Sequence, residues 1–301
     1  MPGVTRAPDL PQAITEGVVV LDGGLATLLE ARGHDLSSDL WSARLLTDDP
    51  DAIAAAHGEF FDAGAQVATT ASYQASFAGF AAIGLDHDEA AGLMRLSVAI
   101  ASRARDEHRP SGWVAASVGP YGAYLADGSE YRGDYGLDVA GLRAFHRPRL
   151  EVLADAGADL LAVETVPCLA EVEAICAELD GTGLTAWLSL TADGDRTRAG
   201  EPLRDAWSMA ADVQEIVAMG VNCCAPGDVT TGLAAASGPL VAYPNSGQGW
   251  DAGRRAWTGA SAFDPGEVIG WLAAGARLVG GCCRIGPDGI AAVASAVSAK
   301  A

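Results

Sequence analysis

Short apolar runs rich in β-branched residues alternate along the chain with longer stretches rich in alanine and leucine. Such runs are typical of strands buried on both faces, and the longer stretches are typical of helices that connect parallel strands. Eight runs fit strands, at residues 18–21, 66–72, 113–118, 159–165, 185–191, 215–223, 239–245 and 276–283. Eight strand and helix units in 301 residues predict an α/β fold, a single-domain (β/α)8 TIM barrel over residues 1–301.

Helical stretches lie between these runs, for example at residues 49–63, 88–107, 138–156 and 265–274, and several begin with an aspartate suited to N-capping. A doubly wound sheet is the alternative, but its first strand is usually followed by a G-x-G-x-x-G turn. The segment Asp22-Gly23-Gly24-Leu25-Ala26-Thr27 lacks that spacing, which favours the barrel. Long loops are expected at residues 121–136, 192–203 and 246–262.

Composition and charge exclude several classes of protein. Apolar residues make up 50% of the chain and charged residues 19%, which excludes disorder, and the absence of an eighteen-residue apolar run excludes a transmembrane helix. Nineteen basic against thirty-nine acidic residues give a net charge of −20, which disfavours nucleic acid and anionic membrane surfaces as partners. The first ten residues lack the basic and apolar regions of a signal peptide, so we expect a cytoplasmic protein with small-molecule partners.

Six cysteines give the first indication of chemistry, because four of them form two adjacent pairs, Cys223-Cys224 and Cys282-Cys283. Both pairs end predicted strands that lie two apart around the barrel, at the rim where barrel enzymes carry their active sites. Thiolates that converge at one point repel one another unless a soft or borderline cation such as Zn²⁺ holds them. Gly280-Gly281 provides the backbone freedom that the second pair needs to face such an ion.

Other interpretations of the cysteines stay open at this point. Buried free cysteines act as small core residues, which is the interpretation we adopt for Cys168 and Cys176. A closed structural zinc site with four thiolates, or a thiol-redox module, also fits the two pairs. A zinc ion with three thiolate ligands and one open position is a poor activator of water but a good holder of an incoming thiolate, which suggests alkyl transfer to sulfur.

Several motifs occur together in a characteristic order. They are Asp22-Gly23-Gly24, Tyr73-Gln74-Ala75-Ser76, the block at residues 119–136, Glu164-Thr165, Gly220-Val221-Asn222-Cys223, Tyr243-Pro244-Asn245-Ser246-Gly247 and Gly280-Gly281-Cys282-Cys283. With these motifs, nearly the whole chain resembles the homocysteine S-methyltransferase family. The block at 119–136 and the Pro-Asn-Ser-Gly element resemble the branch that uses S-methylmethionine or S-adenosylmethionine rather than betaine.

The resemblance implies a zinc-dependent enzyme that transfers a methyl group from S-methylmethionine or S-adenosylmethionine to the thiolate of L-homocysteine, forming methionine. It implies Cys223, Cys282 and Cys283 as the zinc ligands, with Cys224 as a neighbour. Another methyl donor, a selenol acceptor, or a non-catalytic thiol-redox or structural zinc protein is the alternative. The chain lacks the C-terminal extension of betaine-dependent members, so a monomer is expected.

The resemblance also implies how homocysteine is bound. Its amine is expected to meet Glu164 and Asp22, and its carboxylate the backbone N–H groups near Gly23 and Ser72. Taken without the resemblance, Asp22 is equally well a helix cap, and Glu164 a partner of an arginine such as Arg284. Two strand-end amides, those of Asn222 and Asn245, either contact the substrate or hold their own turns.

Overall fold

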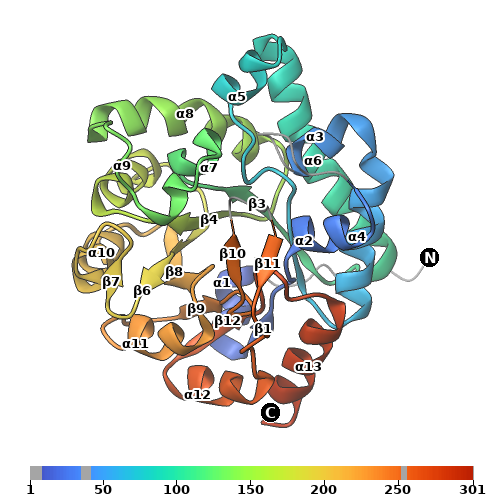
Figure 1. Ribbon diagram of the computed structural model, residues 1–301, viewed down its shortest axis with the longest axis vertical. Coiled ribbons are helices and arrows are strands. Elements are labelled where there is room, and N and C mark those ends of the chain that lie inside the picture. The colour runs from blue at the N-terminus through green and yellow to red at the C-terminus, as the bar shows by residue number, and fades with distance from the viewer. Residues whose placement is uncertain (1–8, 35–41, 252–255, 301) are drawn as a thin grey trace.

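The computed structural model describes residues 9–34, 42–251 and 256–300, and at its centre lies a sheet of eight parallel strands (Figure 1). The strands are β1 (Val19–Val20), β2 (Val67–Thr69), β3 (Trp113–Val118), β4 (Leu160–Val166), β5 (Ala186–Leu190), β8 (Ile216–Asn222), β9 (Leu240–Tyr243) and β12 (Ala276–Val279). Their order is β1-β12-β9-β8-β5-β4-β3-β2, so each strand lies beside its neighbour in the chain. Each of the eight predicted runs overlaps one of these strands, although the run predicted at residues 276–283 ends as a strand at Val279.

The first and second strands meet and bring the two edges of the sheet together. Leu21 forms a parallel bridge with Val67, and the backbone N–H of Gln66 donates to the carbonyl oxygen of Val20. Closure removes the exposed edges that an open sheet would leave, and it confirms the predicted barrel. The run predicted at residues 66–72 ends as a strand at Thr69, and residues 71–74 form a turn above the barrel.

Helices surround the barrel, as Figure 1 shows. The described helices are α1 (Leu10–Glu16), α2 (Leu25–Ala31), α3 (Ser42–Asp48), α4 (Pro50–Asp62), α5 (Phe77–Ala82), α6 (His87–His108), α7 (Tyr121–Leu125), α8 (Val139–Asp155), α9 (Leu169–Leu179), α10 (Leu203–Ala211), α11 (Val229–Leu233), α12 (Val268–Ala273) and α13 (Pro287–Ser298). Asp49 and Asp138 cap α4 and α8 as expected, and Asp86 caps α6 in a capping box with Glu89.

Two apolar cores lie on either side of the sheet. The inner core fills the barrel with side chains such as Trp187 and Leu278. Leu10 and Ile14 of α1 join this inner core beside Trp113, at the start of β3, so α1 covers the amino-terminal end of the barrel. The outer core packs the helices against the sheet. Because one end is covered by α1, polar chemistry is confined to the carboxyl ends of the strands.

The three long loops predicted from sequence contain short helices and hairpins, which their glycine-rich composition does not indicate. Residues 121–136 include α7 and the 3-10 helix η1 (Ser129–Tyr131), and residues 192–203 include the hairpin of β6 (Ala192–Asp193) and β7 (Arg196–Thr197). Residues 246–262 include the hairpin of β10 (Gly249–Asp251) and β11 (Ala256–Thr258), and two further 3-10 helices are η2 (Pro226–Asp228) and η3 (Pro265–Glu267). Backbone groups of the described hairpin residues therefore pair within these short elements.

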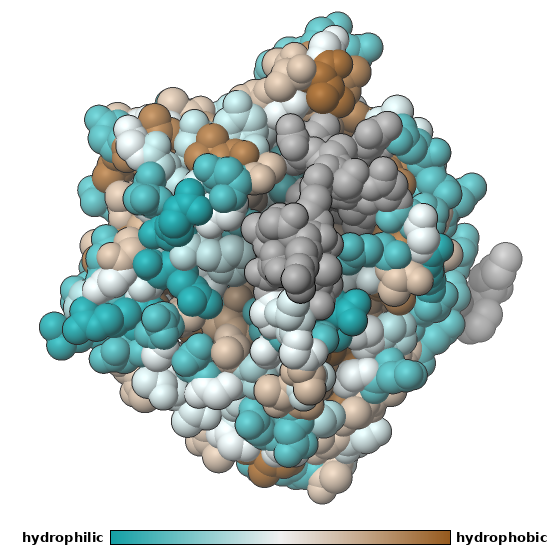
Figure 2. Space-filling model, in the orientation of Figure 1, coloured by the Kyte–Doolittle hydropathy of each residue, from teal (hydrophilic) through white to brown (hydrophobic). Residues whose placement is uncertain are grey.

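The surface agrees with the acidic composition. Figure 2 shows a mostly hydrophilic face on which hydrophobic residues are scattered rather than gathered in one broad patch. Among the described residues, no helix is both long and apolar enough to cross a membrane.

We predict that Gly220→Ala destabilises the barrel. A Cβ atom at this position of β8 would lie well inside van der Waals contact of the Val241 carbonyl oxygen on β9, and the backbone of a central strand cannot move away. Overpacking of this kind costs about 1–3 kcal/mol of unfolding free energy. Thermal unfolding followed by circular dichroism should show a clear fall in the melting temperature.

Gly270→Ala in α12 is the matched control, because open space surrounds the position and alanine favours a helix. Its melting temperature should equal or exceed that of the wild type. A Gly220→Ala protein as stable as the wild type would contradict the close approach of β8 and β9.

Candidate active site

A cavity opens at the carboxyl ends of the barrel strands, where the sequence places its polar strand ends. It is lined by residues near the carboxyl ends of β2, β3, β4 and β9 and by residues that follow β1, β8 and β12. The turn after β2, the start of α2 and η1 complete the lining. The lining includes Asp22, Gly23, Thr69, Tyr73, Gln74, Ser117, Glu130, Tyr131, Glu164, Thr165, Cys223, Tyr243, Cys282 and Cys283. Most of the predicted site residues therefore meet in one place.

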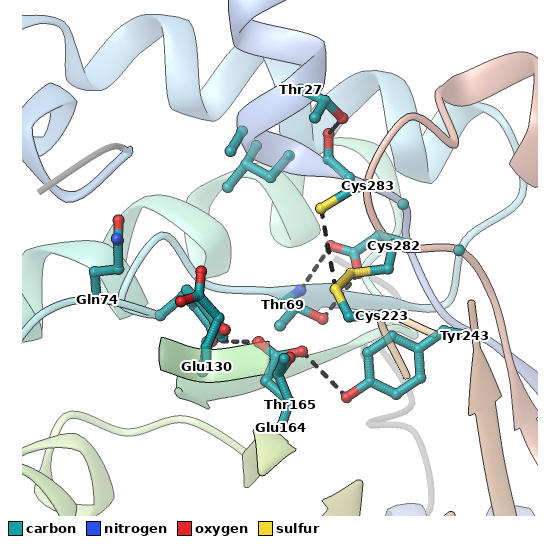
Figure 3. A pocket seen from close by; sticks show the side chains of 18 of the residues that line it. Thr27, Thr69, Gln74, Glu130, Glu164, Thr165, Cys223, Tyr243, Cys282 and Cys283 are labelled. Atoms are coloured by element: carbon teal, nitrogen blue, oxygen red, sulfur yellow. Dashed lines mark hydrogen bonds between the residues drawn. A yellow bond between two sulfur atoms is a disulfide. The ribbon is translucent and has the colours of Figure 1, made fainter. Parts of the chain in front are cut away.

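Three cysteine sulfurs gather on one side of this cavity (Figure 3). Cys223 comes directly after β8, whereas Cys282 and Cys283 come after the end of β12. The three Sγ atoms lie within 4.8 Å of one another, and those of Cys223 and Cys283 are 4.0 Å apart. Cys223 and Cys282 are joined by a disulfide, so the cluster is in an oxidised state in this structure.

The reduced cluster fits a metal ion. Two sulfurs bound tetrahedrally to one Zn²⁺ ion lie about 3.8 Å apart, close to the separation of the Cys223 and Cys283 sulfurs. Three soft sulfur donors favour zinc or a similar thiophilic ion over Mg²⁺ or Ca²⁺. Disulfide reduction is required first, because a metal binds thiolates.

The glycines before Cys282 are required for space. A Cβ atom at Gly280 would meet Leu21 and the Asp22 carbonyl oxygen, and one at Gly281 would overlap Ile285. Neither glycine is in the left-handed region. Close approach of backbones, rather than the backbone freedom that the sequence suggested, is therefore the reason for the Gly-Gly pair.

The remaining cysteines lie outside the cavity. Cys224 is fully buried in the outer apolar core, and Cys168 and Cys176 are buried around α9. Burial raises the pKa of each of these three thiols to about 12, so they stay protonated. The expectation that Cys168 and Cys176 serve packing agrees with these positions, and Cys224 is a neighbour of the cluster rather than part of it.

Glu164, near the end of β4, is held by residues from other strands. Its carboxylate accepts hydrogen bonds from the Ser117 hydroxyl on β3 and from the Tyr243 hydroxyl on β9, the latter at 3.1 Å. Burial raises its pKa to about 7 in spite of these two donors. Arg284 donates to Gln248 and not to Glu164, so the interpretation of Glu164 as the partner of that arginine is wrong.

Asp22 is the second buried carboxylate of the cavity. It accepts a 2.7 Å hydrogen bond from the backbone N–H of Thr69 and a 2.8 Å bond from the Thr69 hydroxyl. Burial, with repulsion from Glu164 as a smaller contribution, raises its pKa to about 7. Asp22 does not cap the following helix, because the N-cap of α2 is Gly24 and no side chain bonds there.

Three other predicted residues have partners within the protein. The Asn222 side chain accepts from the backbone N–H of Thr165 at 2.7 Å and donates to the Thr165 hydroxyl at 2.8 Å. Asn245 donates to the Cys223 carbonyl and accepts from the Gly247 N–H, and the Ser72 hydroxyl donates to the Ser117 carbonyl. None of these three side chains lines the cavity, whereas Gly23, two residues before α2, does.

The amide of Asn222 has a definite local function. Thr165 is the last but one residue of β4, and Cys223 follows β8, which lies two strands away. Both are non-glycine residues in the left-handed region, with φ of 63° and 46°. Such conformations persist only where surrounding contacts determine them. The paired hydrogen bonds of Asn222 hold Thr165 and thereby the strand end that presents Glu164.

Several cavity residues were not proposed from sequence, above all Glu130, Thr69 and Tyr243. Tyr243 ends β9, and its position at a strand end was the available signal. Glu130 belongs to η1, inside a segment that the hydrophobic pattern assigns to a loop, so periodicity gave no indication of its burial.

Comparisons with known proteins agree with this geometry. A family model described as Homocysteine S-methyltransferase matches residues 19–297. The homocysteine S-methyltransferase of Escherichia coli strain K12 is 47% identical over 293 residues, covering 92% of this chain and 94% of that protein.

Solved structures give the same result. The metallated form of the homocysteine methyltransferase MmuM from Escherichia coli aligns with a TM-score of 0.85 and 45% identity, covering 95% of this chain and 99% of that one. The oxidized form of MmuM aligns with the same TM-score at 44% identity, covering 97% and 99%. The sequence identity, the coverage and the cysteine cluster at the barrel rim show that this chain belongs to the homocysteine S-methyltransferase family.

Proposed function

We propose that this chain transfers a methyl group from S-methylmethionine or S-adenosylmethionine to the sulfur of L-homocysteine, with Zn²⁺ held by Cys223, Cys282 and Cys283. The proposal rests on one observation: three cysteine sulfurs and two buried carboxylates line the same cavity. An acceptor that is both a thiol and an amino acid needs the cysteines to bind its sulfur and the carboxylates to bind its amine.

Glu164 and Asp22 suit the amine of homocysteine. Both carboxylates are buried, and their pKa values of about 7 reflect how unfavourable their charges are without a cation nearby. A bound ammonium group supplies that cation and favours ionisation of both. The substrate carboxylate then lies near the backbone at Gly23 and Ser72, and Asn222 and Asn245 act by holding the strand ends.

The three cysteines suit the sulfur of homocysteine. A zinc ion with three thiolate ligands and an open position lowers the pKa of a thiol bound there, which makes the thiolate available at neutral pH. The cysteine side chains fix where that sulfur lies, while Glu164 and Asp22 fix the other end of the same molecule. Two fixed ends determine the direction from which the sulfur meets a methyl donor.

The reaction balances without an additional acid or base. A bond forms between the homocysteine sulfur and the methyl carbon while the bond between that carbon and the donor sulfur breaks. The electron pair of the broken bond stays on the donor sulfur, which changes from a sulfonium to a neutral thioether, and the thiol proton leaves to solvent on binding. Orientation and exclusion of water are what the protein must supply.

The disulfide between Cys223 and Cys282 lends support to a thiol-redox protein as a second candidate. The proximity that suits a shared metal also allows two thiols to oxidise, so the disulfide fits either function. A structural zinc site is the third candidate. We further propose a single domain over residues 1–301 that acts as a cytoplasmic monomer on small molecules. The one eight-stranded barrel supports the single domain, and the scattered apolar residues on the face drawn in Figure 2 support the monomer.

The donor assay tests the proposal directly. The reduced, zinc-loaded protein should form methionine from homocysteine with S-methylmethionine or S-adenosylmethionine, and not with betaine. Chelation should stop turnover, added zinc should restore it, and the melting temperature should change little. Stoichiometric zinc without turnover from any donor, or a large fall in melting temperature on chelation, would favour the structural site.

The cysteine ligands are tested separately. Cys283→Ala should lower zinc affinity by at least about a hundredfold and reduce methyl transfer to background, because one of three thiolates is lost. Cys224→Ala is the matched control, since this adjacent thiol is buried in the outer core and should leave zinc content unchanged. Metal content after dialysis under reducing conditions measures both. Equal zinc in the Cys283→Ala protein and the wild type would contradict the ligand set.

The carboxylates predict a pH dependence of amino-acid binding. L-2-Aminobutyrate carries the amine and carboxylate of homocysteine but no thiol, so its inhibition constant reports the carboxylates alone. Because burial raises the pKa values of Asp22 and Glu164 to about 7, both lose charge below that pH. The affinity for L-2-aminobutyrate should therefore rise from pH 6 to pH 7.5. For a single ionisation the rise is at most about tenfold per pH unit.

Glu164→Gln is the informative variant for that measurement. It should bind the inhibitor more weakly, and its pH dependence should move to lower pH, because the repulsion that helps to raise the pKa of Asp22 is removed. An inhibition constant independent of pH in the wild type would argue against contact between the amine and these carboxylates.

A further inference from the structure

A third carboxylate, that of Glu130, also lines the cavity. Its residue lies in η1 and is only 8% exposed. Its Oε2 atom is buried and has no hydrogen-bond partner within the described part of the chain. Figure 3 shows Glu130 across the cavity from the three cysteines, on the side of Gln74.

Two arginines of this region, Arg132 and Arg198, have other partners. Arg132 forms ion pairs with Asp127 and Asp134 and donates to the Ser129 hydroxyl, with half of its side chain exposed. Arg198 lies over the ring of Tyr131, 5.8 Å from its centre, and donates to Thr191. Burial raises the pKa of Glu130, and this effect outweighs the opposing contributions of its own backbone N–H and of the Arg132 charge.

Glu130 is also separate from the two carboxylates assigned to homocysteine. Glu164 is held by Ser117 and Tyr243, and Asp22 by Thr69, so each has a fixed place near the strand ends. Glu130 instead comes from a segment above the barrel. With the homocysteine amine at the first two carboxylates and its sulfur at the cysteines, Glu130 is left to face the second substrate.

The chemistry of that side suits a sulfonium ion. A sulfonium group carries a positive charge but no N–H, so it is stabilised by a nearby negative charge and by aromatic faces rather than by directional hydrogen bonds. Tyr73 and Tyr131 line the cavity together with Glu130. The electrostatic effect of Glu130 reaches both tyrosines, since it helps to raise their pKa values, burial being the larger cause.

We propose that Glu130 is the counter-charge for the sulfonium group of the methyl donor, and that it makes the cavity prefer the charged donor over a neutral thioether. This inference rests on the proposed function. Methyl transfer neutralises both the thiolate and the sulfonium, so the attraction of Glu130 is strongest for the bound donor and weaker in the transition state. Glu130 is therefore a residue for donor affinity and selectivity rather than for the rate of the chemical step.

Steady-state kinetics with S-methylmethionine test this role. Glu130→Gln keeps the shape of the side chain and removes its charge, and it should raise the KM for the donor by about tenfold to a hundredfold. The KM for homocysteine and kcat should change by less than about threefold. Glu130→Asp keeps the charge with a shorter side chain and should recover part of the donor affinity. Asp134→Asn removes a charge from the same segment outside the cavity and should behave as the wild type.

Selectivity between charged and neutral ligands is a second test, because a purely structural role of Glu130 would not affect it. Methionine differs from S-methylmethionine by one methyl group and the sulfonium charge, so its inhibition constant against the donor gives the neutral reference. The ratio of methionine to S-methylmethionine affinity should approach one in Glu130→Gln while the melting temperature stays near that of the wild type.

An unchanged ratio in a folded Glu130→Gln protein, or equal weakening of both ligands, would overturn the inference while leaving methyl transfer intact. A wild-type protein that shows no turnover with any sulfonium donor would overturn the proposed function and this inference with it. The two failures are distinguished by the activity of the wild type.

Discussion

The Glu164 carboxylate is the interaction on which the geometry of the cavity depends. It accepts from Ser117 on β3 and from Tyr243 on β9, and the Tyr243 hydroxyl in turn contacts Ser189 and Trp187 on β5. Four strands of the barrel are thus tied through one buried carboxylate. Because each of these groups is buried, removal of one member would leave the others without partners, which makes the network rigid.

Charge imbalance is the second constraint. Asp22, Glu164 and Glu130 are buried in one cavity beside three cysteine sulfurs, and no arginine or lysine of the described chain lines it. Such an arrangement is unfavourable while empty, because each anion has lost water without gaining a cation. The proposed occupants are an ammonium group, a divalent metal ion and a sulfonium, which supply positive charge at three separate places. Because of the same imbalance, neutral molecules of similar shape would bind more weakly.

Much of this arrangement could be predicted from the sequence, because it depends on periodicity. Eight apolar runs gave the strands, and the strand order placed β8 and β12 on either side of β9, so Cys223 and Cys282 had to approach each other. The side-chain positions of residues beyond the strand ends were harder to predict, because they depend on tertiary contacts. Ser72 follows β2 and Asn222 ends β8, yet their side chains bond within the protein and do not line the cavity. A period of two residues fixes the face of a side chain only while the strand continues.

The residues at which the strand pattern stops are also those at which the backbone is least ordinary. Thr165 and Cys223 both have positive φ, and each follows directly after a residue of the functional network, Glu164 and Asn222 respectively. In a regular strand, the next side chain would point to the opposite face, into the helix layer. The left-handed turn at Cys223 instead keeps its sulfur at the cavity, while Cys224 returns to the outer core. Cys223 and Cys224 therefore differ in environment because of one backbone conformation. This explains why that pair contributes only the sulfur of Cys223 to the cluster.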